Sequence, residues 1–356
     1  MLPAAFRRAL SAMLLAGVLS AAAAPITATH FGGADYVSVI DVCGRLGLRY
    51  AGSVDGRLLT LRNAAHTGVL MAEHREMVLD GVRVQLGDLA VARGGHFYVS
   101  LTDYEHRLKP LFRPDLAEPL PRRPRIIVLD PGHGGVDPGA ENKRFHAQEK
   151  TFTLDVALRL RPLLLAQGWK VAMTRVRDAP FSNDKARDLE MRAGFAAQWG
   201  ADVFLSIHFD AAPGDSTRGS EIFSFDPVGQ RSSDAWGKRI LEPPLTQPSP
   251  GNRFDDWNAL LAHTLYRRLP SSLATYDHGE KLGNWSVLRN APCPAVLVEP
   301  VFLSNEAEVQ RLETPAFRQQ IAETLAAGLK DYAALLDSLQ PRPSPAPAPL
   351  PSAAAK

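Results

Sequence analysis

Apolar runs alternate with amphipathic helical segments from residue 125 onward. Buried strands are predicted at Ile126–Asp130, Lys170–Thr174, Ala201–Ile207 and Pro294–Glu299. Helical periodicity predicts helices at Thr151–Gln167, Asp188–Trp199, Asn258–Leu269 and Pro315–Leu339. This alternation predicts an α/β domain over residues 125–339, with a mostly parallel, twisted sheet flanked by helices. In such a domain the functional groups lie just past the carboxyl ends of the strands.

Residues 28–113 show a different pattern, in which short strands lead into short helices. Tyr36–Asp41 and Phe97–Asp103 each have this form, while Arg57–Leu61 and Met77–Val84 read as hairpin strands, the latter with a turn-forming Asp80-Gly81. This predicts a small α+β accessory domain, and its phrasing resembles the N-terminal domain of copper amine oxidases. Its histidines are scattered and are expected to be surface residues, not ligands: His66, His74, His96 and His106.

Four further segments fall outside this plan. Residues 114–124 are rich in proline and arginine and are expected to form a linker, and the proline-rich residues 226–256 an insertion in the second domain. Residues 340–356 are rich in proline and alanine, which predicts a disordered tail. Residues 1–24 carry Arg7-Arg8, an apolar run and small residues, the order of a signal peptide. We therefore expect export to the periplasm or cell envelope, by the general or the twin-arginine route.

The composition of the chain argues against several classes of protein. The 356 residues are 45% hydrophobic and 22% charged, as expected for a folded protein. Forty Lys and Arg against 38 Asp and Glu give a net charge of +2, too even for a nucleic-acid-binding face. The apolar run near the N-terminus is too short to span a bilayer, so an integral membrane protein is not expected. The two cysteines, Cys43 and Cys293, fall in different predicted domains and are expected to be free, buried thiols.

Candidate chemistry lies at the ends of three predicted strands. His133 follows the first strand within a glycine-rich turn, and His208 follows the strand that ends at Ile207. Glu149, at the start of a helix between them, could be a helix N-terminal charge or a third ligand. Glu299 ends a wholly apolar strand, where a carboxylate is costly unless it is paired or functional.

Histidine, glutamate and histidine around one open position is the pattern of a catalytic zinc site, with a nearby carboxylate as base. We therefore predict that His133, Glu149 and His208 bind Zn²⁺. Glu299 is the predicted general base and later acid. Zinc would polarise the scissile carbonyl and lower the pKa of a water to roughly 7.

Several phrases between residues 125 and 336 resemble the zinc-dependent N-acetylmuramoyl-L-alanine amidases of bacterial cell walls. They are Asp130–Ala140, Glu149-Lys150, Thr174-Arg175, Ala201–His208, Gly219–Glu221, Val287–Arg289, Pro294–Glu299 and Phe302–Asn305. The resemblance implies hydrolysis of the amide bond between N-acetylmuramic acid and L-alanine in peptidoglycan, for wall remodelling or daughter-cell separation. It implies His133, Glu149 and His208 as zinc ligands and Glu299 as the catalytic glutamate. It also implies that residues 226–256 could be autoinhibitory and the target of a protein activator.

The sequence departs from the family pattern in two places. Glu299 is followed by Pro300-Val301, and His278-Gly279 stands where relatives tend to have Arg-Gly, before an expected strand that ends in Val287-Leu288-Arg289. Neither departure touches a predicted ligand. A zinc peptidase or deacetylase could use the same four residues. A catalytically inactive wall-binding protein would be expected to have lost one of them.

Overall fold

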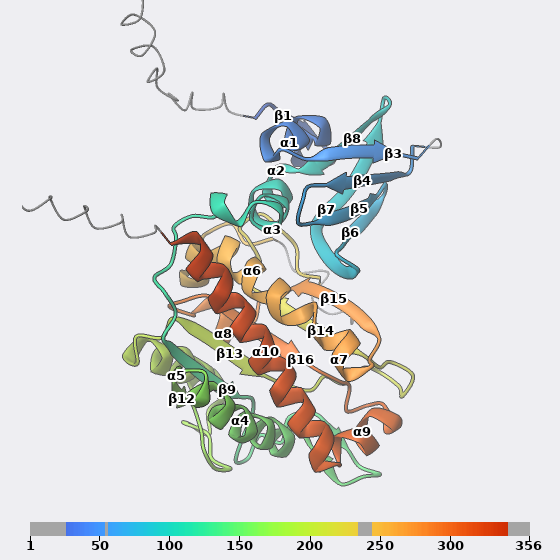
Figure 1. Cartoon of the computed structure of the whole chain (residues 1–356). Helices are drawn as coiled ribbons and strands as arrows, with labels where there is room; N and C mark the ends of the chain where they lie inside the picture. The colour runs from blue at the N-terminus through green and yellow to red at the C-terminus, as the bar shows by residue number, and fades with distance from the viewer. Residues whose placement is uncertain (1–25, 54–55, 234–243, 341–356) are drawn as a thin grey trace, which may run out of the picture.

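The computed structural model describes residues 26–53, 56–233 and 244–340. A small N-terminal domain packs on one side of a larger α/β domain (Figure 1). The predicted signal peptide, most of the predicted tail and the centre of the predicted insertion lie outside the described residues. Within the described ranges, no helix is long and apolar enough to cross a membrane.

Among its described residues, the N-terminal domain has eight strands, with one helix after the second strand and the other helical segments after the eighth. Its strands are β1 (Ala28–Phe31), β2 (Ala34–Ser38), β3 (Arg49–Gly52), β4 (Leu58–Arg62), β5 (Thr67–Met71), β6 (His74–Leu79), β7 (Val82–Arg93) and β8 (His96–Ser100). Its helices are α1 (Val39–Leu46), α2 (Leu101–Asp103), a π-helical turn (Tyr104–Leu108), α3 (Lys109–Phe112) and a 3-10 turn (Pro114–Leu116). The expected hairpin turn is present, with positive φ at Asp80 and Gly81 (51° and 89°), as a two-residue turn of this hand requires.

The second domain is built on a six-stranded sheet in the order β12-β9-β13-β16-β14-β15. The strands are β9 (Ile126–Pro131), β12 (Lys170–Met173), β13 (Val203–Ile207), β14 (Ser220–Ser224), β15 (Asp277–Leu282) and β16 (Ala295–Glu299). Only the β14–β16 pair is antiparallel. A two-stranded ribbon, β10 (Glu141–Asn142) with β11 (Ala147–Gln148), precedes the first long helix. The predicted mostly parallel sheet flanked by helices is confirmed.

Helices cover both faces of this sheet (Figure 1). They are α4 (Glu149–Ala166), α5 (Lys185–Gln198), α6 (Asp255–Tyr266), α7 (Leu269–Leu273), α8 (Ser286–Arg289), α9 (Glu306–Leu312) and α10 (Pro315–Leu339), with a 3-10 turn at Pro250–Phe254. Successive residues of β9 alternate between faces, so Ile127 and Leu129 join one core cluster and Val128 the other. A strand buried on both faces reads as a continuous apolar run, which is why these strands could be predicted.

Two predictions about individual segments and residues differ from the structure. Val287-Leu288-Arg289 belongs to the short helix α8 and not to a strand. Short apolar runs fit a strand and a buried helical turn equally well, so this sequence could not decide between them. The expectation of surface histidines holds for His74 and His96, whereas His66 and His106 are half-buried. Both cysteines are buried and free, as predicted.

The two domains share a polar and partly buried contact surface. β7 continues the sheet of the second domain through one parallel residue pair with β15, Val84 with Glu280. Buried Arg107 donates to Ser224 Oγ at 2.8 Å. Gln230 Nε2 donates to Asp103 Oδ1 at 2.8 Å. These contacts fix the start of residues 226–256 against the N-terminal domain.

Candidate metal centre

His133 lies in a sharp turn directly after β9. Its backbone has φ of +62°, a region that non-glycine residues seldom adopt, and Gly134 and Gly135 follow with φ of +133° and +59°. Buried Arg192 holds the turn by donating to the carbonyl oxygens of Pro131 (2.9 Å) and His133 (2.8 Å). Backbone strain of this kind persists only where the surroundings enforce it, which is common at functional sites.

His208 follows β13, the neighbour of β9 in the sheet. Its N–H donates to the carbonyl oxygen of Val298 at 2.9 Å, which fixes the backbone between β13 and β16. A Cβ atom at Gly132 would lie 2.2 Å from the His208 ring, so only glycine fits there. The glycine-rich turn therefore makes room for the second histidine as well as for its own bend.

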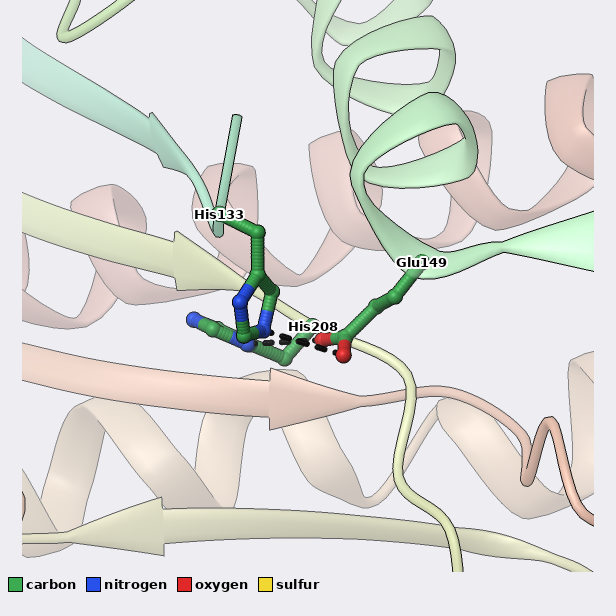
Figure 2. Close-up of side chains that lie close together, drawn as sticks. All are labelled: His133, Glu149 and His208. Atoms are coloured by element: carbon green, nitrogen blue, oxygen red, sulfur yellow. Dashed lines mark hydrogen bonds and ion pairs between the residues drawn. The ribbon is translucent and has the colours of Figure 1, made fainter. Parts of the chain in front are cut away.

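Glu149 is the first residue of α4 and is 4% exposed. Its Oε2 accepts the N–H of Ala140 at 2.7 Å, and its Oε1 accepts the N–H of Phe209 at 3.1 Å. A Cβ atom at Gly139 would lie 2.4 Å from Glu149 Oε2. The carboxylate is thus held in one orientation, pointing away from the helix and towards the two histidines (Figure 2).

The three side chains converge on one point from three separate elements (Figure 2). His133 Nε2 lies 3.0 Å from Glu149 Oε2, and His208 Nδ1 lies 2.8 Å from Glu149 Oε1. One donor atom from each residue lies within 4.8 Å of the other two, and no other such group occurs in the described ranges. Two imidazoles and a carboxylate are ligands that suit zinc, and three protein ligands leave a position open.

The charge states of this cluster depend on one another. Burial alone would raise the pKa of Glu149, but hydrogen bonds from His133 and His208 lower it overall. Burial alone would lower the pKa of His133, but Glu149 and Asp137 raise it. An anionic Glu149 carboxylate beside a protonated His133 ring is therefore favoured in the protein without metal. A dication in the same place would favour a neutral ring and would substitute for its positive charge.

Glu299 ends β16 and lines the same pocket as the three candidate ligands. It is 7% exposed, and its Oε2 has no hydrogen-bond partner among the described residues. Burial raises its pKa well above the usual value, and the charges of Asp210, Glu149 and Glu221 raise it further. A buried carboxylate with an uncommitted oxygen and a raised pKa can accept a proton near neutral pH.

The pocket itself has a volume of about 560 Å³, within the usual range for small-molecule sites. All four residues predicted from the sequence line it. Its remaining lining comes from Ala140, from α5, from the segment after β13, and from β16 and residues 284–289.

The sequence did not predict the residues that hold the candidate ligands in place. Asp137 Oδ2 lies 3.0 Å from Nδ1 of His133, leaving Nε2 of that ring to face the centre. Such a carboxylate orients the ring and fixes its tautomer. Asp130 is fully buried and accepts from Arg192, Thr174 and Ser206 beneath the site. Asp137 lies four residues from His133, a spacing that could have suggested it; Arg192 offered no local signal.

A buried ion pair lies beside Glu299 and was also not predicted. Glu221 is directly opposite Glu299 in the β14–β16 ladder. Its carboxylate pairs with Lys281 of β15, and both side chains are nearly inaccessible. Burial raises the pKa of Glu221 to about 8, although Lys281 opposes the shift. The surroundings of Glu299 therefore combine two further carboxyl groups, Glu221 and Asp210, with one ammonium group.

Residues 127–331 match the family model described as N-acetylmuramoyl-L-alanine amidase. The chain is 33% identical over 233 residues to N-acetylmuramoyl-L-alanine amidase AmiC of Escherichia coli O6:H1, covering 60% of this chain and 54% of the relative. It is 36% identical over 232 residues to AmiC of Neisseria meningitidis serogroup B, covering 59% and 53%. The chain thus spans about half the length of these curated relatives.

Among solved structures, the chain is similar to the catalytic domain of CwlV, an N-acetylmuramoyl-L-alanine amidase from Bacillus (Paenibacillus) polymyxa var. colistinus. The sequence identity is 25% and the TM-score 0.47, with 59% of this chain and 99% of that chain covered. The matched family region contains all four predicted site residues.

Proposed function

Because the chain belongs to the N-acetylmuramoyl-L-alanine amidase family, we propose that it hydrolyses the amide bond between N-acetylmuramic acid and L-alanine in peptidoglycan. The observation that carries this proposal is the convergence of His133, Glu149 and His208 in one pocket with Glu299. The biological use would be wall remodelling or separation of daughter cells.

His133, Glu149 and His208 would hold one Zn²⁺ ion. When bound, the ion would polarise the scissile carbonyl and make a water acidic enough to be deprotonated near pH 7. Asp137 keeps the His133 ring oriented through its Nδ1 atom. The backbone N–H groups of Ala140 and Phe209 hold the Glu149 carboxylate in place.

Glu299 would move the protons of the reaction. Its carboxylate accepts a proton from the attacking water as the water oxygen forms a bond to the carbonyl carbon. It then returns that proton to the nitrogen of L-alanine as the C–N bond breaks, so the peptide leaves as a neutral amine. The raised pKa of Glu299 suits a group that must act as base and then as acid.

Digestion of purified sacculi tests the proposal. Incubation with the protein should release free stem peptides that begin with L-alanine, identified by mass spectrometry, and a chelator should abolish the release. Cleavage within the stem peptide would indicate a peptidase instead, and release of acetate a deacetylase. Zinc content measured on the same preparation should be one ion per chain.

The same proposal places the protein in the cell envelope or periplasm. It is supported by the order of basic, apolar and small residues in 1–24. Fractionation of cells that express the full chain should recover the protein outside the cytoplasm with residues 1–24 removed. Recovery of the uncleaved chain in the cytoplasm would contradict export.

We propose that residues 28–113 form an accessory module that resembles the N-terminal domain of copper amine oxidases. Its role would be to bind or position the wall and not to supply chemistry, because none of its residues that the structure describes lines the catalytic pocket. A chain that lacks this domain and remains folded should cleave a soluble muropeptide but act poorly on intact sacculi. Loss of muropeptide cleavage in such a folded chain would contradict this role.

Residues 226–256 could regulate access to the pocket. Ser233 and Leu282 exchange hydrogen bonds, with Ser233 N–H donating to the carbonyl oxygen of Leu282 at 2.9 Å. Leu282 precedes by two residues Asn284, which lines the pocket. A protein activator would then act by displacing this segment. Deleting it should raise activity on sacculi; unchanged activity in a folded, zinc-loaded deletion would count against regulation.

A further inference from the structure

The catalytic pocket has a second side, away from the candidate metal ligands. It is formed by the first turns of α5 and by α8 with the residues before it, and these two helices pack against each other. The side chains that line this side are Lys185, Leu189, Asn284, Trp285, Ser286, Val287 and Arg289.

The two sides of the pocket carry opposite charge. The carboxylates that line it, Glu149, Asp210 and Glu299, come from the metal side. The α5–α8 side contributes two cations, Lys185 and Arg289. A ligand that reaches from one side to the other would therefore meet carboxylates and the candidate metal ligands at one end and cationic donors at the other.

Arg289 is placed to bind an anion. It is half-buried, and its Nη1 atom donates to the neutral Oδ1 of Asn284 at 3.1 Å. In the part of the chain that the structure describes, no carboxylate lies within ion-pair distance of its guanidinium. A guanidinium has five donors in a fork that matches a carboxylate, so its capacity is largely uncommitted. Leu189 and Val287 add apolar lining to the same pocket, and an ion pair is stronger where less water surrounds it.

Lys185 is a weaker candidate for the same ligand. Its side chain is 69% exposed, and its ammonium lies 3.4 Å from Asp137 Oδ2. An exposed ammonium contributes little to a single ion pair and is screened by salt. It would attract an anionic ligand to the pocket without fixing its position.

We propose that Arg289, assisted by Lys185, binds a carboxylate of the stem peptide and gives the pocket a preference for acidic stems. The inference rests on the proposed function, because it takes the scissile amide to lie at the metal side. The second residue of a stem peptide is a glutamate linked through its side chain, which leaves its α-carboxylate free. Two residues span at most about 7 Å, so this group would still lie inside the same pocket.

Two substrates and four variants test the inference on the full chain. The substrates are N-acetylmuramoyl tripeptides that differ only in whether the α-carboxylate of the second residue is free or amidated. The variants are Arg289→Gln, Arg289→Lys, Lys185→Gln and, as a matched control, Arg187→Gln. Arg187 is an exposed residue of the same helix as Lys185 and does not line the pocket.

The wild-type protein should cleave the free-carboxylate substrate with the higher kcat/KM. Arg289→Gln should lower kcat/KM on that substrate roughly 10- to 100-fold, mainly through KM, and hardly change it on the amidated one, because a hydrogen bond between charged groups is lost. Arg289→Lys should keep part of the preference. Lys185→Gln should have a smaller effect that disappears at high salt, and Arg187→Gln should have none.

A binding measurement separates recognition from turnover. In the Glu299→Gln background, calorimetry should show tighter binding of the free-carboxylate tripeptide, and adding Arg289→Gln should remove the difference. Equal loss on both substrates, or a wild-type protein that treats them alike, would overturn the inference while leaving the amidase function intact. Failure of the wild-type protein to cleave either substrate would instead overturn the proposed function. Melting temperatures of all variants exclude unfolding as the cause.

Discussion

Two clusters of histidine and carboxylate, both among the described residues, differ in what surrounds them. The first is the candidate metal centre, His133, Glu149 and His208. The second lies between the domains, where His263 Nδ1 is 2.7 Å from Glu280 Oε1 and its Nε2 is 3.9 Å from Asp80 Oδ2. Both consist of residue types that bind metals. Only the first brings three donor atoms within 4.8 Å of one another, among the described residues.

Position in the fold accounts for the difference. The candidate ligands of the first cluster follow two adjacent parallel strands or begin a helix, so they meet at the carboxyl edge of the sheet and line a pocket. His263 lies inside α6 and is 4% exposed, and Glu280 lies within β15 and is 2% exposed. Neither residue lines the pocket, so we expect this cluster to contribute to stability. The same residue types would then serve a reaction at a strand end and stabilise a contact between domains.

Removing a ligand should have the largest effect. His133→Ala or His208→Ala leaves two protein ligands, so both metal and turnover of a soluble muropeptide should fall to the level of chelator-treated protein. His263→Gln, in the second cluster, should keep one zinc per chain at temperatures below its own melting point. Metal analysis and muropeptide turnover on the same preparations check this. Retained zinc and turnover in either alanine variant would rule out the ligand assignment.

Glu299→Gln should separate metal binding from proton transfer. The amide is close in size to the carboxyl group but cannot accept the proton, so turnover should fall roughly 10²- to 10⁴-fold. Zinc content should stay near one per chain, because Glu299 is not a proposed ligand.

The alternative is that Glu299 serves only structure. In that case Glu299→Gln would lower the melting temperature and leave turnover nearly unchanged. Zinc content, melting temperature and muropeptide turnover from one preparation distinguish the two readings.

The first cluster could be predicted from the sequence, and the second could not. His208 directly follows one apolar strand, and His133 follows another after a short turn, so the strand pattern alone puts both at one edge of a parallel sheet. Glu149 starts the helix that comes between these two strands in the sequence. His263 and Glu280 lie 17 residues apart, and Asp80 comes from the other domain. Nothing local relates Asp80 to His263, because the contact depends on how the two domains pack.

The residues that hold the candidate site in shape could not be predicted from the sequence either. The need for glycine at positions 132 and 139 arises from the rings and carboxylate that approach them, which only the folded structure reveals. Arg192 reaches the His133 turn from α5, more than fifty residues along the chain. Candidate site residues can therefore be predicted from the sequence when they lie at the ends of strands or helices. The residues that hold them in place through long-range hydrogen bonds cannot.

Removing a residue of the second cluster should lower the free energy of unfolding and leave muropeptide turnover unchanged. Glu280→Gln removes the closer carboxylate from a buried histidine whose pKa is raised to about 9. Removing one partner of a buried ion pair typically costs about 3–5 kcal/mol. Urea denaturation should show this loss, with normal muropeptide turnover where the variant is folded. A similar loss of turnover without loss of stability would mean that the two clusters are coupled.

The smallest expected effect is on the pH dependence of stability. Burial alone would lower the pKa of His263, but Glu280 and Asp80 raise it to about 9, above the ordinary value of 6.5. A pKa that is higher in the folded state means that the protonated ring favours folding. This contribution is complete below about pH 6.5 and is lost as the pH rises through about 9. The melting temperature should therefore fall by a few degrees between pH 6.5 and 9.5. In His263→Gln, which has no titrating ring at this position, the melting temperature should fall by less over the same pH range. Equal falls in both proteins would show that His263 is not protonated in the folded state, and the second cluster would then be a neutral hydrogen-bonded contact.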